Sequence, residues 1–296
     1  MPTQRIESLD SLQKASPAIG VAYAGYLEEF LGKFPDAFDY VEIPFELLRH
    51  NPSVLRLVEI KPTVLHCASL SMVGNIDSSA TTIKEIQSWI AATKTPWLGE
   101  HLAFISAQGL FDQTPEPDAL QPYHIGYTVS PLMNQITVDR VVGRHERYLQ
   151  MLGLPILLEN SPVYFRMPGS TLSQTEFIQQ ICERSSALLL LDLTHWYITS
   201  KQMKFDPFEE LLRLPLNRVI EVHISGVDDQ EGICWDNHAA RAPKIVHDLL
   251  AEVLRLTPVR AITLEYNWSR RFPQAALFDE LSMVKEAIAT SMSYDA

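Results

Sequence analysis

Apolar residues fall in eight short runs along the chain, and longer stretches of a different period separate them. The run "LLLL" at residues 188–191 is apolar at consecutive positions, which is typical of a strand buried on both faces. The other runs share its short length and apolar character. The predicted strands span residues 18–25, 38–44, 63–69, 97–104, 155–160, 187–193, 218–225 and 261–267.

The stretches between these runs repeat apolar residues at i, i+3, i+4 and i+7, which predicts amphipathic helices. The clearest helices span residues 79–94, 138–152, 173–185, 244–256 and 274–291. Strands that alternate with helices indicate a parallel sheet, and eight strands are the number that closes a (β/α)8 barrel. A doubly wound open sheet is the competing fold. It is disfavoured because no G-x-G-x-x-G follows the first strand and no P-loop occurs.

We therefore predict an α/β protein with the (β/α)8 TIM-barrel fold, formed by a single domain over residues 1–296, since no repeat or low-complexity linker divides the chain. One connection is unusually long. Residues 105–134, between the fourth strand and the next helix, are rich in Pro and turn-forming residues and also carry Phe111, Tyr123, Ile125 and Tyr127. A loop of this length in a compact domain is usually functional, so we expect a packed lid over the active site.

Polar side chains gather where the predicted strands end. In a (β/α)8 barrel these carboxyl ends meet at one face, where the active site is built. The candidate residues at or just beyond the strand ends are Glu42, His66, Glu100, His101, Glu159, Asn160, Asp192, His195, Glu221, His223, Asp236, His238 and Glu265. The remaining histidines, His50, His124, His145 and His247, lie in predicted helices or in the lid, and we expect them to be ordinary surface or loop residues.

Any one of these residues alone would be explained by an ordinary structural role, but the set is harder to explain. Lys and Arg are nearly absent from the strand ends, so several carboxylates would be desolvated together without cationic partners. Bound metal ions resolve this conflict. Imidazole and carboxylate ligands without thiolate suit Fe, Mn or Zn. The candidate ligands are too many for one ion, so two or three ions are expected, with Glu159 as the candidate bridge.

Some members of the set have an alternative role. Glu42, Glu100 and Glu221 could each orient a ligand histidine through a hydrogen bond instead of binding metal. Glu100 and Glu42 are also the available candidates for a catalytic acid–base group, and Asn160 is a further catalytic candidate.

Composition narrows the function further. The formal net charge of −12 argues against a nucleic-acid-binding protein and is compatible with one that holds metal cations. No apolar run is long enough for a transmembrane helix, and no signal peptide is visible, so we expect a cytoplasmic protein that does not enter the membrane. Cys67, Cys182 and Cys234 form no CxxC pair and are expected to be plain thiols.

The segments "GEHLAF", "LLEN", "LLLLDLTHWY", "EVHISG", "DNH" and "TLEYN" resemble, in order and spacing, the DUF692 family of multinuclear non-haem iron-dependent oxidative enzymes (MNIO), whose fold is related to xylose-isomerase-like barrels. The resemblance covers nearly the whole chain. It implies two or three iron ions, Fe²⁺ and Fe³⁺, and O2 as co-substrate. It also implies a ribosomally made precursor peptide as substrate, modified at Cys or another residue, and often a small partner protein that binds the peptide leader.

Carried over to this chain, the resemblance implies the iron ligands His66, His101, Glu159, Asp192, His223, Asp236, His238 and Glu265. His195 stands where many members have Asn, and we keep it among the candidate ligands. Two other functions remain open from the residues. One is a divalent-metal-dependent sugar isomerase, epimerase or hydrolase on the same barrel. The acidic segment "SGVDDQEG" argues against a phosphosugar there. The other is a barrel that only binds metal or a partner.

Overall fold

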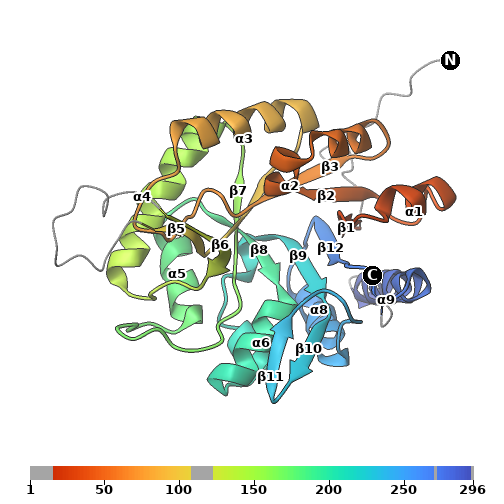
Figure 1. The fold of residues 1–296 in the computed structure, drawn as a ribbon. Coiled ribbons are helices and arrows are strands. Elements are labelled where there is room, and N and C mark those ends of the chain that lie inside the picture. The colour runs from red at the N-terminus through yellow and green to blue at the C-terminus, as the bar shows by residue number, and fades with distance from the viewer. Residues whose placement is uncertain (1–15, 108–122, 270–271, 295–296) are drawn as a thin grey trace.

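The computed structural model describes residues 16–107, 123–269 and 272–294, and it shows eight parallel strands closed into a barrel (Figure 1). Around the barrel the order of the strands is β1-β12-β9-β8-β7-β4-β3-β2. This confirms the predicted (β/α)8 fold, and each barrel strand lies within one of the eight apolar runs. The strands are β1 (Ala18–Ala22), β2 (Tyr40–Pro44), β3 (Thr63–Cys67), β4 (Leu98–His101), β7 (Ile156–Glu159), β8 (Leu188–Asp192), β9 (Val219–Ser225) and β12 (Ala261–Glu265).

Helices surround the barrel, and the longer ones match the predicted amphipathic stretches. Three of these helices begin at a capping side chain: Ser79, Asn134 and Ser173 each accept a hydrogen bond from a backbone N–H of the first turn. The α-helices are α1 (Leu27–Lys33), α2 (Phe45–His50), α3 (Ala80–Thr93), α4 (Gln135–Leu152), α5 (Gln174–Arg184), α6 (Leu193–Met203), α7 (Pro207–Leu211), α8 (Lys244–Leu256) and α9 (Gln274–Tyr294). Among the described connections are the 3-10 helices η2 (Pro52–Glu59) and η4 (Leu216–Arg218).

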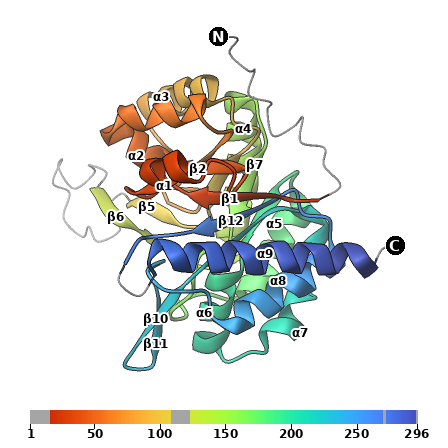
Figure 2. The same cartoon turned by 90° about the vertical axis from the view of Figure 1, so that its right-hand side faces the viewer.

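Two antiparallel hairpins project from the same side of the barrel (Figure 2). One pairs β5 (Phe104–Ala107) with β6 (Tyr123–Val129), and the other pairs β10 (Val227–Gln230) with β11 (Ile233–Asp236). The expected lid at residues 105–134 therefore contains paired strands, which its turn-forming residues did not indicate. Residues 108–122, with Phe111, lie outside the described part of the chain, so the lid stays a prediction.

The barrel is filled at its amino-terminal end by apolar side chains. Tyr40, Val64, Trp97, Leu157 and Leu190 form a buried cluster there with Ala18 and Ala261. A much larger cluster lies between the outer face of the barrel and the helices. Because the apolar cluster closes one end, polar groups inside the barrel can gather only towards the carboxyl ends of the strands. None of the described helices combines the length and the apolar character needed to cross a bilayer.

Candidate metal centre

The alternation of side chains along each strand decides which strand-end residues face the barrel interior. In β4, Gly99 and His101 face inward. A Cβ built on Gly99 would lie 2.4 Å from His66 Nδ1, so only glycine leaves room for this imidazole on the neighbouring strand. Glu100 lies between them and faces outward. The "GEH" sequence therefore makes space for one histidine and supplies another.

Glu159, at the end of β7, lies at the middle of the inward-facing group. Its Oε2 is 3.0 Å from His66 Nε2 and 3.2 Å from His101 Nε2. Its Oε1 is 3.3 Å from His195 Nδ1 and 3.9 Å from His223 Nδ1. Glu159 is 1% exposed, and neither oxygen makes a hydrogen bond within the described residues. One carboxylate thus faces four imidazoles from four different strand ends.

The imidazole of His223, in β9, is oriented by two carboxylates, Glu42 and Glu221. Its Nε2 lies 2.9 Å from Glu42 Oε2, so this nitrogen carries the proton that the carboxylate accepts. Glu221 Oε1 is 3.7 Å from the same nitrogen, and its two oxygens accept hydrogen bonds from Tyr40 and Trp97. The Nδ1 of His223 is left facing Glu159 and has no hydrogen-bond partner among the described residues. This arrangement matches the expected alternative in which Glu42 and Glu221 support a ligand histidine.

Asp192 explains why the very apolar strand β8 ends in a carboxylate. Its Oδ1 accepts the backbone N–H of His195 at 2.6 Å and so caps helix α6, while its Oδ2 has no hydrogen-bond partner in the described residues. Asn160 makes two hydrogen bonds to the backbone of the same residue: its side-chain amide donates to the Asp192 carbonyl and accepts from the Asp192 N–H. Asn160 therefore positions Asp192 by joining the ends of β7 and β8.

The remaining side chains of the inward-facing group follow β9 in the sequence: Asp236, His238 and Glu265. Asp236, at the end of β11, places Oδ2 3.0 Å from His195 Nε2 and Oδ1 2.9 Å from His238 Nε2. Glu265, at the end of β12, is 3.4 Å from His238 Nε2 and 3.6 Å from His223 Nδ1. Gly226 makes this approach possible, because a Cβ there would lie 1.8 Å from the carbonyl oxygen of Ala240.

These side chains form overlapping sets of donor atoms that lie within 4.8 Å of one another. Glu159 occurs in two of the sets, as do His66, Asp192, His195 and His223, so its role as the bridge stays a prediction. The sets are Glu42–His66–His223, His66–His101–Glu159, Glu159–Asp192–His223, Asp192–His195–Glu265 and His195–Asp236–His238. The eight ligands that the family resemblance implies, and His195, are each a member of at least one set, whereas Glu100 and Glu221 are in none.

The donor chemistry fits metal ions. Several buried donor atoms face the group without a hydrogen bond from any described residue, among them both oxygens of Glu159, Asp192 Oδ2, His223 Nδ1 and Glu265 Oε2. Buried polar atoms are rarely left in this state, because each unmade hydrogen bond costs about 1–3 kcal/mol. Within the described residues, no Lys or Arg nitrogen lies within 4.0 Å of these carboxylates. Metal cations would pair with these carboxylates and with the unprotonated imidazole nitrogens.

The imidazoles and carboxylates of the group shift one another's pKa values. Burial alone would raise the pKa of Glu159, but His101 and His66 hold it well below its usual range. Burial lowers the pKa of His66, and the carboxylates of Glu42 and Glu159 outweigh it and raise this pKa to about 10. Burial raises the pKa of Asp192 to about 8, against the opposing effect of His195. Protons therefore occupy part of the group before any metal binds.

Glu100, a candidate catalytic residue, does not face the inward-facing group. Glu100 lies outside the barrel, is 0% exposed, and accepts the Leu70 N–H. It joins none of the donor sets found among the described residues. Its catalytic role remains a prediction with no contact in the group to support it.

Two histidines differ from the expectation of a surface or loop position. His145 is 1% exposed, with Nε2 3.3 Å from the Ile156 carbonyl, and His247 is 9% exposed, 3.0 Å from Glu280 Oε2. Both face the interior because they lie on the apolar faces of α4 and α8. His50 is exposed as expected, and the side chain of His124 lies outside the described residues.

Comparison with known proteins decides the family. The model of a family described as "RiPP precursor modification enzyme MbnB/TglH/ChrH", where RiPP denotes a ribosomally synthesised and post-translationally modified peptide, matches residues 19–289. The chain belongs to this family. It is the DUF692 (MNIO) family that the sequence motifs resembled, so that recognition is confirmed.

Individual relatives agree with this membership. A UPF0276 protein of Shewanella sediminis is 27% identical over 267 residues, which are 88% of this chain and 90% of that protein. Among solved structures, a D-tagatose 3-epimerase-like protein gives a TM-score of 0.56 at 15% identity, covering 94% of this chain and 100% of that one. Endonuclease IV from Thermus thermophilus gives 0.55 at 15% identity, covering 91% and 100%. At such identities these structures show a shared xylose-isomerase-like barrel and nothing more.

Sequence reasoning missed several residues that shape the centre. The Tyr164 hydroxyl accepts the backbone N–H of Asp236 at 3.2 Å, and its ring packs against Trp235 in a tilted arrangement. Gly99 and Gly226 provide space for His66 and Ala240. The glycine directly before Glu100 and His101 was a usable signal, because a strand glycine often marks a close approach. Tyr164 had no such signal, since it lies in an irregular loop.

Proposed function

We propose that this protein is a multinuclear, non-haem iron-dependent enzyme that uses O2 to modify a residue, with Cys as the first candidate, of a ribosomally synthesised precursor peptide. The observation that carries the proposal is the Glu159 carboxylate, buried among four imidazoles without a hydrogen bond from the described residues. Membership of a family of peptide-modifying enzymes supports the substrate class.

Three subsites would hold the metal. His66 and His101 would share the first with Glu159, and His223 and Asp192 would share the second with the same carboxylate. The third would be formed by His195, Asp236 and His238, with Glu265 between the second and third. Imidazole and carboxylate donors without thiolate suit iron, and all three cysteines of the chain lie buried outside these sets.

Bound iron would supply O2 activation and a Lewis acid for the substrate thiolate. The chain's own residues would do the rest. Glu42 accepts the Nε2 proton of His223 and thereby fixes the tautomer that presents Nδ1 to the centre. Asn160 holds the backbone of Asp192, and its carbonyl accepts from His195 Nδ1 at 2.9 Å, which leaves Nε2 facing Asp236. The apolar cluster around Tyr40 and Trp97 closes the barrel below and excludes water from that side.

We also propose a partner protein, a lid and a cellular location. A small protein that binds the peptide leader is proposed as partner, the 105–134 segment as lid, and the cytoplasm as location. The sugar-epimerase alternative gains no support from the solved structures, because their likeness concerns the fold alone. No described feature favours it over a peptide substrate.

The test uses synthetic peptides that correspond to short, Cys-containing reading frames beside the gene. Each peptide is incubated with iron-loaded protein in the presence and absence of O2, and its mass is measured. The proposal expects an O2-dependent mass change in one peptide that disappears when its Cys is replaced by Ser or when the enzyme carries Asp192→Ala. A mass change that needs neither iron nor O2 would contradict it, as would sugar epimerisation with a manganese-loaded protein that leaves every peptide intact.

A further inference from the structure

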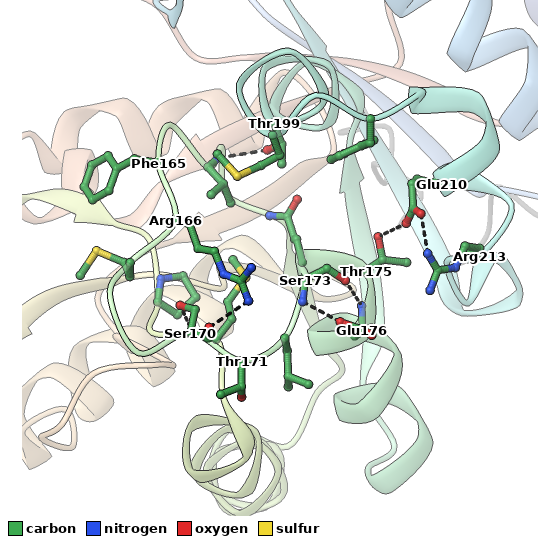
Figure 3. Close-up of a pocket in the computed structure, with 18 residues that line it drawn as sticks. Phe165, Arg166, Ser170, Thr171, Ser173, Thr175, Glu176, Thr199, Glu210 and Arg213 are labelled. Carbon is green, nitrogen blue, oxygen red and sulfur yellow. Dashed lines mark hydrogen bonds and ion pairs between the residues drawn. The ribbon is translucent and has the colours of Figure 1, made fainter.

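A cavity of about 430 Å³ is bounded on one side by the loop that follows β7. Loop residues 163–173, the start of α5 and the carboxyl end of α6 line it (Figure 3). Much of its wall is apolar, with Met133, Val163, Met203 and Phe205. Its size falls within the range of about 300–1,000 Å³ that is typical of ligand sites and can hold one or two amino-acid side chains.

The polar groups of this cavity are unevenly paired. Arg213 and Glu210 form an ion pair, and Glu210 also accepts from Thr175. Arg166 extends across the cavity towards Ser170 (Figure 3), donates to the Ser170 carbonyl at 2.9 Å, and forms no ion pair with a carboxylate within the described residues. Arg166 is exposed and offers N–H donors to an incoming carboxylate or carbonyl. The Glu176 carboxyl also lines the cavity, and its pKa is lowered by hydrogen bonds from Ser173 and, to a smaller extent, by Arg213 and Arg166.

Gln174 adds an unsatisfied acceptor to the wall. Its side chain is buried, 8% exposed, and its Nε2 donates to the Ser161 carbonyl at 2.7 Å. Its Oε1 has no hydrogen-bond partner among the described residues. A ligand that satisfies both groups must carry an N–H donor for Gln174 and an acceptor for Arg166, next to apolar atoms. A peptide segment meets all three requirements.

The cavity wall and the residues around the centre are built from the same two segments, the loop that follows β7 and helix α6. Thr199, in its wall, accepts the Val163 N–H at 3.0 Å and donates to the His195 carbonyl at 2.8 Å. Ser161, which holds Gln174, directly follows Asn160. The loop that follows β7 thus begins with Asn160 at the centre and forms a wall of the cavity from Val163 onwards.

We infer that this cavity is a docking site for the precursor peptide, which binds an apolar side chain between Met133, Val163, Met203 and Phe205 and a neighbouring acidic residue at Arg166. The inference rests on the proposed function for the identity of the occupant. It goes beyond that function because it places substrate recognition outside the metal-binding residues. It also predicts the sequence to be recognised: an apolar residue close to Asp or Glu.

The test selects binders from a displayed library of random dodecapeptides and titrates the enriched peptides, acetylated and amidated, against purified protein. Arg166→Glu reverses the charge and Met203→Trp fills the cavity. The matched controls are Arg255→Glu and Met151→Trp, at exposed positions outside the cavity. We expect enriched peptides that pair an apolar with an acidic residue, and binding at least tenfold weaker for both cavity variants but unchanged for the controls.

A second measurement does not depend on how the variants fold. With ¹³C-methyl methionine in the unmodified chain, the same peptides should shift the signals of Met133, Met167 and Met203, which line the cavity, and leave that of Met151 in place. No enrichment, enrichment that the cavity variants leave intact, or shifts confined to Met151 would each overturn the inference. Metal content is measured in parallel. Iron-loaded protein without cavity-dependent binding refutes only the docking site, whereas cavity-dependent binding by a chain that takes up no iron refutes only the proposed chemistry.

Discussion

At the scale of single residues, Glu159 has the most demanding position in the chain. Its two oxygens lie between four imidazoles, so a metal ion on either side would share this carboxylate. The neighbouring residues have distinct roles around this carboxylate. Glu42 and Asn160 hold other residues in place, whereas Asp192 both caps a helix and presents a bare oxygen to the centre.

Glu159→Gln should lower the metal content by at least one ion per chain, because the amide loses the charge and one of the two anionic oxygens that adjacent ions would share. Elemental mass spectrometry of the purified variant measures this. Glu280→Gln is the matched control, since Glu280 is equally buried and also pairs with a histidine, but lies on α9. Equal metal content in the Glu159 variant and the unmodified protein would refute the shared-carboxylate assignment.

Glu42→Gln should weaken metal binding about 10–100-fold without abolishing it, because the amide no longer supplies the charge that polarises His223. Titration against a competing chelator measures the affinity, and saturating metal should restore the full content. An unchanged affinity would show that Glu42 does not act through His223. Complete loss at saturating metal would indicate that Glu42 is itself a ligand.

Metal affinity should rise with pH. His66 and His238, with pKa values raised to about 10 and about 9, and Asp192, raised to about 8, are largely protonated at neutral pH before metal binds. Binding must displace these protons, so the free energy of metal binding becomes more favourable as pH rises through these pKa values. Proton release into a weakly buffered solution during metal titration checks the sign. Proton uptake, or an affinity that is flat between pH 7 and 9, would contradict it.

At the scale of elements, strand ends and their glycines build the centre. Gly99→Ala would place a methyl group 2.4 Å from His66 Nδ1 and force this imidazole away from Glu159. We expect loss of metal from the first subsite with the barrel retained, measured by metal analysis and circular dichroism. Gly143→Ala in α4 is the control. Nothing lies within 4 Å of its Cβ, so this change should keep the metal and stabilise the helix by about 0.5–1 kcal/mol. Full metal content in the Gly99 variant would refute the steric argument.

The elements also show how far sequence reasoning reaches. Apolar runs located all eight barrel strands, because strands buried on both faces leave an unambiguous pattern. The β5–β6 hairpin was not predicted, since its pairing depends on the register between segments separated by many residues. Glu100 was grouped with His101, although strand alternation alone places these neighbours on opposite faces. His145 and His247 were assigned to the surface because a single histidine gives no indication of its side of a helix.

At the scale of the whole molecule, the barrel brings together donors from residue 42 to residue 265, which no local motif could have placed within one group. The carboxylates of this group lack Lys and Arg partners in the described residues, and the chain as a whole is acidic. We therefore propose that bound cations are part of the native molecule. We propose more than one, because the donor residues are too many for a single ion and fall into five overlapping sets, two of which include Glu159.

The most direct test is the number and identity of the metal ions in protein purified without oxygen, measured by elemental mass spectrometry beside the visible spectrum. We expect two or three irons per chain and an absorption band that changes on exposure to O2. One zinc or manganese per chain, with no iron taken up on reconstitution, would contradict this expectation.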